Sequence, residues 1–322
     1  YKVPSYPSIK TKQDFEDISK KLCGEFEKTL YQYFVSHYIS KRTPYKGILL
    51  YHAVGVGKTC SAITLAEGFL TSHATYKEPK IWVIMPKALK QSFKEQIFSL
   101  SNFENFEYLA NQCTGSLYMD LLHLMKDHDK QKTTTKLKKL IQSRYKLFTY
   151  ESFATFIETE YTQKNKIVKD KVIIVDEAHN IRSMNDEKRV YTTLTNILQQ
   201  GVDNRLVLLS ATPMYNTPED IYDLLHLLLL NDKRTDILKE YPFPACFNNG
   251  VANKKAIKMI EQLANNYISY LKGKNPFTFA LKLSPKYLGN RVPFLTHEFE
   301  FDSRNLGLIL YKIKNIVKNN TI

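Results

Sequence analysis

The chain has 322 residues, of which 43% are hydrophobic, and carries a formal net charge of +14. This length fits one large domain or two modest ones around a substantial core, and the apolar runs are too short to cross a bilayer, so we expect no membrane association. The excess of Lys and Arg favours a polyanionic partner, most simply nucleic acid. Many Lys, Asn, Ile, Tyr and Phe residues beside few glycines would also arise from an AT-rich genome, so charge alone leaves both explanations open.

The four cysteines, Cys23, Cys60, Cys113 and Cys246, are scattered and lack CxxC spacing. The sequence therefore predicts neither a zinc site nor a disulfide framework, and a reducing compartment is expected. No secretory signal is present. Because residue 1 is Tyr rather than Met, we expect the chain to be an excised or processed segment of a longer protein.

Residues 1–45 are polar and aromatic and are predicted to form a helical lead-in, with helices near Asp14–Phe26 and Glu27–Ser40. Tyr31-Gln32 lies on the second of these helices. A glutamine amide can both donate to and accept from an adenine edge, so Gln32 is a candidate base reader. A solvated helix glutamine is the alternative.

An apolar strand at Gly47–Tyr51 leads into a glycine-containing loop that ends Gly57-Lys58-Thr59, and apolar residues at helical spacing follow from Cys60 to Leu70. This order of strand, loop and helix is the context of a phosphate-binding P-loop. Gly55 and Gly57 can turn successive N–H groups into one hollow at the positive end of the helix dipole. A chance GKT on a surface turn is the alternative.

Within this loop, Lys58 would reach the β- and γ-phosphates of a nucleotide, and the Thr59 hydroxyl would hold Mg²⁺. ATP and Mg²⁺ are the predicted cofactors. The predicted cofactor-binding residues are Gln32, His52, Ala53, Val54, Gly55, Val56, Gly57, Lys58, Thr59 and Cys60. His52 stands where the pattern usually begins with glycine.

Further strands and helices alternate along the chain. The predicted strands are Ile81–Met85, Phe106–Leu109, Tyr145–Thr149, Val172–Val175 and Arg205–Leu209. The predicted helices are Ala88–Leu100, Leu117–Met125, Lys136–Ser143, Tyr150–Phe156, Lys188–Gln199 and Pro218–Leu229, with Lys126–Thr135 as a charged surface loop. This alternation implies right-handed crossovers and an α/β fold: a mostly parallel central sheet flanked by helices, with ligands at the carboxyl ends of the strands.

Residues 46–230 are predicted to form this domain. Beyond about residue 231 the pattern changes to a smaller, mainly helical C-terminal extension. Its predicted elements are a loop at Tyr241–Val251, a helix at Lys254–Leu271, a strand at Phe294–Phe301 and a basic helix at Asp302–Val317.

Hydrolysis of a nucleoside triphosphate needs a metal and an oriented water as well as phosphate positioning. Asp176 follows an apolar strand and is placed like a Walker-B aspartate, holding Mg²⁺ directly or through water. Glu177 is the natural group to orient and deprotonate the attacking water. We therefore expect Lys58, Asp176 and Glu177 to be catalytic and Thr59 and Asp176 to hold the metal; an acidic helix cap is the alternative for the carboxylate pair.

His179 would lie between the nucleotide and the next strand, where it could hydrogen-bond Ser210 or Thr212. These three residues are therefore candidates for coupling the nucleotide site to the rest of the protein. Ordinary turn chemistry is the alternative for Ser210-Ala211-Thr212.

The ordered set GKT, MPKALKQSF, FTYESF, VDEAHN and LLSATPMYN resembles the first RecA-like domain of superfamily 2 helicases and translocases, of a DEAH-box-like kind. More narrowly, LLYHAVGVGKT, SATPMYNTPEDI and YISYLKGKNP resemble the ATPases of large cytoplasmic DNA viruses of poxvirus and asfarvirus type, near the early transcription factor small subunit and nucleoside triphosphatase I. The similarity covers about residues 30–300. A residue other than glycine is usual at the His52 position in those relatives.

The resemblance implies several roles. Tyr31-Gln32 resembles the upstream element that contacts adenine, and Ser210 with Thr212 resembles the motif that couples ATP state to the grip on nucleic acid. The residues that it assigns to the nucleic-acid backbone are Pro86 and Lys87 of motif Ia, and Thr149, Tyr150 and Ser152 of motif Ib. Lysine, hydroxyl and loop N–H groups suit phosphates without base specificity.

A superfamily 2 motor also needs a second RecA-like domain, whose QxxGRxxR-type motif supplies an arginine to the γ-phosphate. No such motif occurs in this sequence. The resemblance therefore implies an N-terminal motor half, with residues 231–322 as a linker toward a second domain. Since an arginine finger can contribute a factor of about 10³ or more in turnover, we expect the isolated chain to bind ATP weakly and hydrolyse it poorly.

The leading hypothesis is the ATP-binding half of a nucleic-acid-dependent ATPase that acts in viral transcription or genome handling. The alternatives are an ATP-gated promoter-binding transcription factor subunit without processive motion, and a silent nucleotide-binding scaffold. Expected partners are nucleic acid (DNA in preference to RNA) and a viral transcription factor subunit or RNA polymerase. The expected location is the host cytoplasm, at the viral factory, with packaging in the virion as a further option.

Overall fold

The computed structural model describes residues 29–71, 74–99, 113–114, 118, 130–181, 188–214, 218–248 and 251–271. Contacts divide the chain into Tyr1–Thr278 and Phe279–Ile322, and every described residue belongs to the first unit. The elements predicted at Asp14–Phe26, Phe106–Leu109, Phe294–Phe301 and Asp302–Val317 lie outside the described residues, as does Leu117–Met125 apart from Tyr118.

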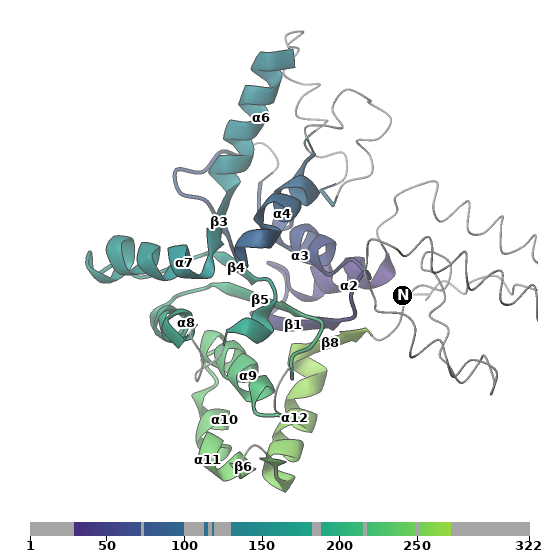
Figure 1. The fold of residues 1–322 in the computed structure, drawn as a ribbon, viewed down its shortest axis with the longest axis vertical. Coiled ribbons are helices and arrows are strands. Elements are labelled where there is room, and N and C mark those ends of the chain that lie inside the picture. The colour runs from purple at the N-terminus through teal and green to yellow at the C-terminus, as the bar shows by residue number, and fades with distance from the viewer. Residues whose placement is uncertain are drawn as a thin grey trace, which may run out of the picture. The chain divides into compact units, whose positions relative to one another are not determined.

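A six-stranded parallel sheet forms the centre of the described structure (Figure 1). Its strands are β1 (Gly47–His52), β2 (Ile81–Met85), β3 (Tyr145–Thr149), β4 (Val172–Val175), β5 (Arg205–Ser210) and β8 (Ile268–Leu271). They lie side by side in the order β3-β2-β4-β5-β1-β8. The predicted α/β class and the parallel sheet are thereby confirmed.

Helices cover both faces of this sheet (Figure 1). The helices before β3 are α2 (Leu30–Tyr38), α3 (Lys58–Glu67), α4 (Lys90–Ile97, after a 3₁₀ turn at Lys87–Leu89) and α6 (Lys130–Arg144). Those after it are α7 (Tyr150–Ile157, continued by a π-helical turn at Glu158–Thr162), α8 (Lys188–Gln200), α9 (Asp220–Asn231), α10 (Thr235–Glu240), α11 (Phe243–Cys246) and α12 (Lys254–Tyr267).

Alternate strand residues belong to two separate hydrophobic cores. Leu49 and Leu208, for example, pack with the group that contains α7, α8, α9 and α12, whereas Leu50 and Leu209 pack with α2, α3, α4 and α6. Because side chains in a strand alternate between faces, a strand buried on both sides must be apolar throughout. This requirement explains the continuous apolar runs by which the sequence marked these strands.

Three element predictions were wrong. The helix predicted at Lys254–Leu271 ends at Tyr267, and its last four residues form β8, which pairs with β1. Residues 130–135, predicted as part of a loop, belong to α6. The segment Tyr241–Val251, predicted as a loop, contains α11 and the start of an antiparallel pair, β6 (Phe247–Asn248) with β7 (Val251–Ala252).

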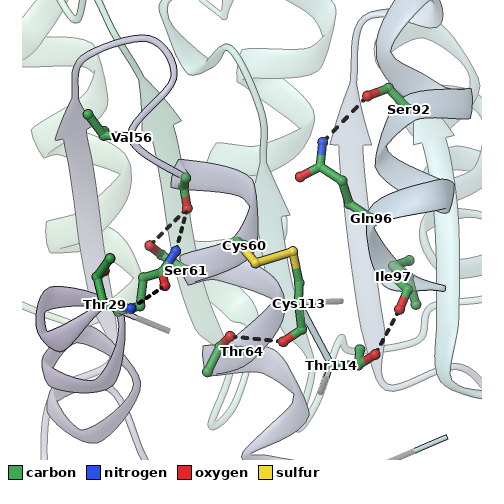
Figure 2. The surroundings of a disulfide bond; sticks show 12 residues. Thr29, Val56, Cys60, Ser61, Thr64, Ser92, Gln96, Ile97, Cys113 and Thr114 are labelled. Carbon is green, nitrogen blue, oxygen red and sulfur yellow. Dashed lines mark hydrogen bonds between the residues drawn. A yellow bond between two sulfur atoms is a disulfide. The ribbon is translucent and has the colours of Figure 1, made fainter. Parts of the chain in front are cut away.

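The sequence predicted no disulfide framework, but the structure contains one disulfide bond. Cys60, in the first turn of α3, is bonded to Cys113 (Figure 2). The same figure shows the Thr64 hydroxyl donating to the Cys113 carbonyl at 3.2 Å and the Thr114 hydroxyl donating to the Ile97 carbonyl at 2.9 Å. The pair is separated by 53 residues and carries no short-range motif, so its spacing alone could not reveal it.

Within the described ranges, none of the helices combines the length and the apolar composition needed to span a membrane.

Candidate nucleotide site

The predicted site residues gather at one edge of the sheet. In a parallel sheet all carboxyl ends of the strands meet at the same edge. The P-loop follows β1, Asp176 follows β4 and Ser210 ends β5, while Pro86 follows β2 and Thr149 ends β3. The strand order therefore places the P-loop and Ser210 on one side of Asp176, and the predicted nucleic-acid residues on the other.

The P-loop has the backbone shape that an anion site needs. Gly55 and Gly57 have φ values of 81° and 83°, which glycine adopts without strain. A Cβ atom on Gly57 would lie 2.7 Å from Gln32 Nε2, so a side chain there would also have to displace the Gln32 amide. The first intrahelical bond of α3 runs from Ser61 N to the Gly57 carbonyl at 3.0 Å. The three preceding N–H groups lie at the helix N-terminus, where such donors can bind an anion.

Side chains of helix α2 hydrogen-bond to backbone carbonyls of the P-loop. The Tyr31 hydroxyl donates to the Val56 carbonyl, and Gln32 Nε2 donates to the Gly57 carbonyl at 3.3 Å. Gln32 Oε1 accepts from Thr29 N at 2.8 Å, so both ends of this buried amide have protein partners. Each end of the amide makes one of the two hydrogen bonds available to it, and adenine reading by Gln32 stays a prediction.

Lys58 lies among the groups that a nucleotide site requires. Its ammonium donates to the His52 carbonyl at 3.0 Å. Burial lowers the pKa of Lys58, while the carboxylates of Glu177 and Asp176 act in the opposite direction. The P-loop lysine and the two candidate catalytic acids thus interact electrostatically across the sheet edge.

His52 contributes its backbone rather than its ring to this edge. The imidazole is fully buried, and its Nε2 lies 2.9 Å from Ser269 Oγ of β8. Nδ1 has no hydrogen-bond partner among the described residues. Burial, and secondarily the charge of Lys58, lower the pKa of His52 from 6.5 to about 4.

This shift makes stability depend on pH. His52 is protonated below pH 6.5 in the unfolded chain, but only below about pH 4 in the folded protein. Its contribution to the free energy of unfolding is therefore fully present above pH 6.5 and is lost as the pH falls toward 4. The loss should reach about 3 kcal/mol in the free energy of unfolding. We expect His52→Gln, which keeps a polar partner for Ser269, to remove this loss.

Denaturant unfolding of the parent and His52→Gln proteins from pH 7 to 4.5 measures the effect. Asp176 changes the free energy of unfolding with pH in the opposite direction, because burial and the neighbouring Glu177 raise its pKa to about 6. The difference between the two proteins isolates the imidazole. Parallel pH profiles would contradict the assignment of a buried neutral His52.

Asp176 and Glu177 form a tight turn after β4. Asp176 is buried, and its Oδ1 accepts from Glu177 N at 3.0 Å. Glu177 is left-handed, with φ 51° and ψ 48°, which is uncommon for a residue with a side chain. Such outliers cluster at functional sites, and this one precedes the 3₁₀ turn Ala178–Asn180.

The predicted coupling residues are hydrogen-bonded to one another, and one of them lies close to the Glu177 carboxylate. His179 Nδ1 lies 3.0 Å from Ser210 Oγ, a contact that the sequence predicted, and 3.3 Å from Glu177 Oε2. Ser210 Oγ accepts from Thr212 N at 3.0 Å. The candidate base is therefore connected to the end of β5; that these residues perform coupling stays a prediction.

The predicted nucleic-acid residues occupy the ends of β2 and β3. Lys87 is exposed after β2. Thr149 and Ser152 bond to each other as the capping box of α7, with Thr149 N donating to Ser152 Oγ at 2.8 Å. The Tyr150 hydroxyl donates to the carbonyls of Asp176 and Glu177 at 2.7 and 3.0 Å. Sequence reasoning missed this contact, because no signal in the segment TYES distinguishes an inward-facing tyrosine from an outward-facing one.

The residues at this edge fit Mg²⁺ and a nucleotide. The described part of the chain contains no group of three or more His, Cys, Asp or Glu side chains that could hold a metal. Mg²⁺ at nucleotide sites is commonly held by one or two protein groups together with phosphate oxygens and waters. Thr59 and Asp176 are of the right chemical type, and Lys58 with the helix N-terminus suits the phosphates.

A P-loop followed by a helix, an acidic pair after a buried strand, and a parallel sheet that brings them together define a P-loop nucleotide-binding protein. The family model for the SNF2-related domain matches residues 31–271. The chain belongs to this family, which is of the superfamily 2 helicase type, and its fold is the RecA-like P-loop fold.

Relatives occur in large DNA viruses. A protein of Acanthamoeba polyphaga mimivirus that carries the name of an ATP-dependent RNA helicase is 30% identical over 286 residues, which are 87% of this chain and 45% of that protein. A helicase-named protein of Invertebrate iridescent virus 3 is 31% identical over 204 residues, 62% of this chain and 20% of that protein. The chain therefore spans less than half the length of these curated relatives.

A solved structure, the Sulfolobus solfataricus SWI2/SNF2 ATPase core in complex with double-stranded DNA, aligns with 75% of this chain and 43% of its own. The sequence identity to this structure is 17%, and the TM-score is 0.40.

Proposed function

We propose that this chain is the ATP-binding half of a nucleic-acid-dependent ATPase, a DNA translocase or helicase, that acts in viral transcription or genome handling. The observation that carries the proposal is the placement of the P-loop after β1 and of the Asp176–Glu177 turn after β4 at the same carboxyl edge of the parallel sheet. Lys58 and the N-terminus of α3 hold the triphosphate, Asp176 and Thr59 hold Mg²⁺, and Glu177 takes the proton of the attacking water.

The placement of the remaining residues supports nucleic acid as the partner. The exposed Lys87 and the start of α7 lie beyond Asp176 at the same edge, on the side of β2 and β3. A net charge of +14 favours binding to a phosphate backbone. The viral relatives carry helicase names. We propose DNA in preference to RNA as the nucleic acid. We further propose a viral transcription factor subunit or RNA polymerase as the protein partner, and the cytoplasmic viral factory as the location.

Displacement of the third strand from a DNA triplex tests whether the motor moves along duplex DNA. We expect the complete protein to release the third strand when Mg²⁺ and ATP are present, and not with a non-hydrolysable ATP analogue. ATP-dependent binding to duplex DNA without release would instead favour the promoter-gating alternative. We also propose that the chain belongs among the poxvirus- or asfarvirus-type ATPases. Within that group we place it near the early transcription factor small subunit and nucleoside triphosphatase I.

A further inference from the structure

The phenol of Tyr150 joins the predicted nucleic-acid segment to the catalytic turn. Its hydroxyl donates to both the Asp176 carbonyl, at 2.7 Å, and the Glu177 carbonyl, at 3.0 Å. We propose that Tyr150 is a positioning residue that holds the Asp176–Glu177 turn and makes its geometry respond to nucleic acid bound at the start of α7. The inference rests on the proposed function.

The turn requires support because its backbone is unusual. Left-handed backbone costs about 1–2 kcal/mol for a residue with a Cβ atom, and Glu177 adopts it with φ 51°. Asp176 N bonds to the Ile84 carbonyl of β2 at 2.8 Å, and the Glu177 carbonyl also accepts from Asn180 N at 3.0 Å, while both carbonyls of the turn lie beyond the last residue of β4. The two carbonyls share the single hydroxyl proton of the phenol, so a shift of its ring displaces the backbone that carries the two carboxylates.

Tyr150 is itself fixed by the start of α7. It is the first residue of that helix, and the helix is capped by the reciprocal pair of Thr149 and Ser152. Its half-buried ring packs against the hydrophobic core on the α7 side of the sheet. Since β2 lies between β3 and β4, the side chain spans one strand to reach the turn. A movement of this capped helix start would therefore be transmitted to the carbonyls of the turn.

Tyr150→Phe keeps the ring and removes only the hydroxyl. In the complete protein, we expect the ratio of ATP turnover with saturating duplex DNA to turnover without DNA to fall about fivefold, the effect of one lost hydrogen bond. We expect the dissociation constant for ATP, measured with a fluorescent ATP analogue, to stay within about twofold, because the groups that bind phosphate are untouched.

Tyr222→Phe is the matched control. The Tyr222 hydroxyl also donates to a backbone carbonyl, that of Tyr241, at 2.9 Å, but it does so between α9 and the end of α10. The ratio of ATP turnover with duplex DNA to turnover without DNA should be the same in Tyr222→Phe as in the parent protein. This comparison distinguishes a loss of coupling from a general effect of removing a buried hydroxyl.

Three outcomes are informative. A lower ratio in Tyr150→Phe with a parental ratio in Tyr222→Phe supports the proposal. A DNA-stimulated parent whose ratio is unchanged in Tyr150→Phe, or equally lowered in both variants, overturns the proposal and leaves the ATPase function standing. A parent protein that no nucleic acid stimulates overturns the proposed function and this inference with it.

Discussion

Glu177→Gln is expected to reduce ATP turnover by about 10²–10⁴-fold, the usual contribution of a positioned general base. The amide keeps the size and polarity of the carboxylate but cannot accept the proton of the attacking water. ATP binding should be retained or slightly strengthened, because a negative charge close to the triphosphate is removed. Steady-state release of phosphate by the complete protein, measured beside ATP affinity, checks both expectations.

The control for this change is Glu261→Gln, which replaces an exposed carboxylate on α12. It should leave turnover at the parental rate. If Glu177→Gln also turned over ATP at that rate, a different group would have to act as the base.

Lys58→Ala should weaken ATP binding by about 30-fold to several thousand-fold, which corresponds to the roughly 2–5 kcal/mol lost when one member of a buried charge pair is truncated. The effect is expected to be large because Lys58 is the P-loop lysine that is expected to contact the β- and γ-phosphates. It also interacts electrostatically with Asp176 and Glu177 in the folded protein. Titration of the protein with a fluorescent ATP analogue in the presence of Mg²⁺ measures the change.

Lys94→Ala provides the matched control, since it removes an exposed ammonium from α4. We expect parental affinity for this variant. Parental affinity in Lys58→Ala as well would remove the P-loop assignment.

Much of the central sheet was predictable because its signal is local. Ile81–Met85, Tyr145–Thr149 and Val172–Val175 were predicted with the bounds that the structure has. A strand covered on both faces needs apolar residues at consecutive positions, and this requirement is legible in a single run of sequence. The position of the P-loop and of Asp176 at one edge followed from the same parallel topology.

The features that the sequence did not predict depend on interactions between distant parts of the chain. The four residues of β8 continued an amphipathic helix pattern, and only their pairing with β1 makes them a strand. The bond between Cys60 and Cys113 joins positions 53 residues apart. The contact of Tyr150 with the Asp176–Glu177 turn depends on β2 lying between β3 and β4. Such adjacency is a property of the folded sheet, and no short motif encodes it.

ATP turnover by the complete protein, with and without nucleic acid, tests most directly whether the protein is a nucleic-acid-dependent ATPase. The Lys58→Ala variant serves as the blank that assigns the activity to this P-loop. A nucleic-acid-dependent ATPase should hydrolyse ATP several-fold faster when duplex DNA is added, and less so with RNA. A rate that is the same with duplex DNA, single-stranded DNA, RNA and no nucleic acid would contradict a nucleic-acid-dependent ATPase.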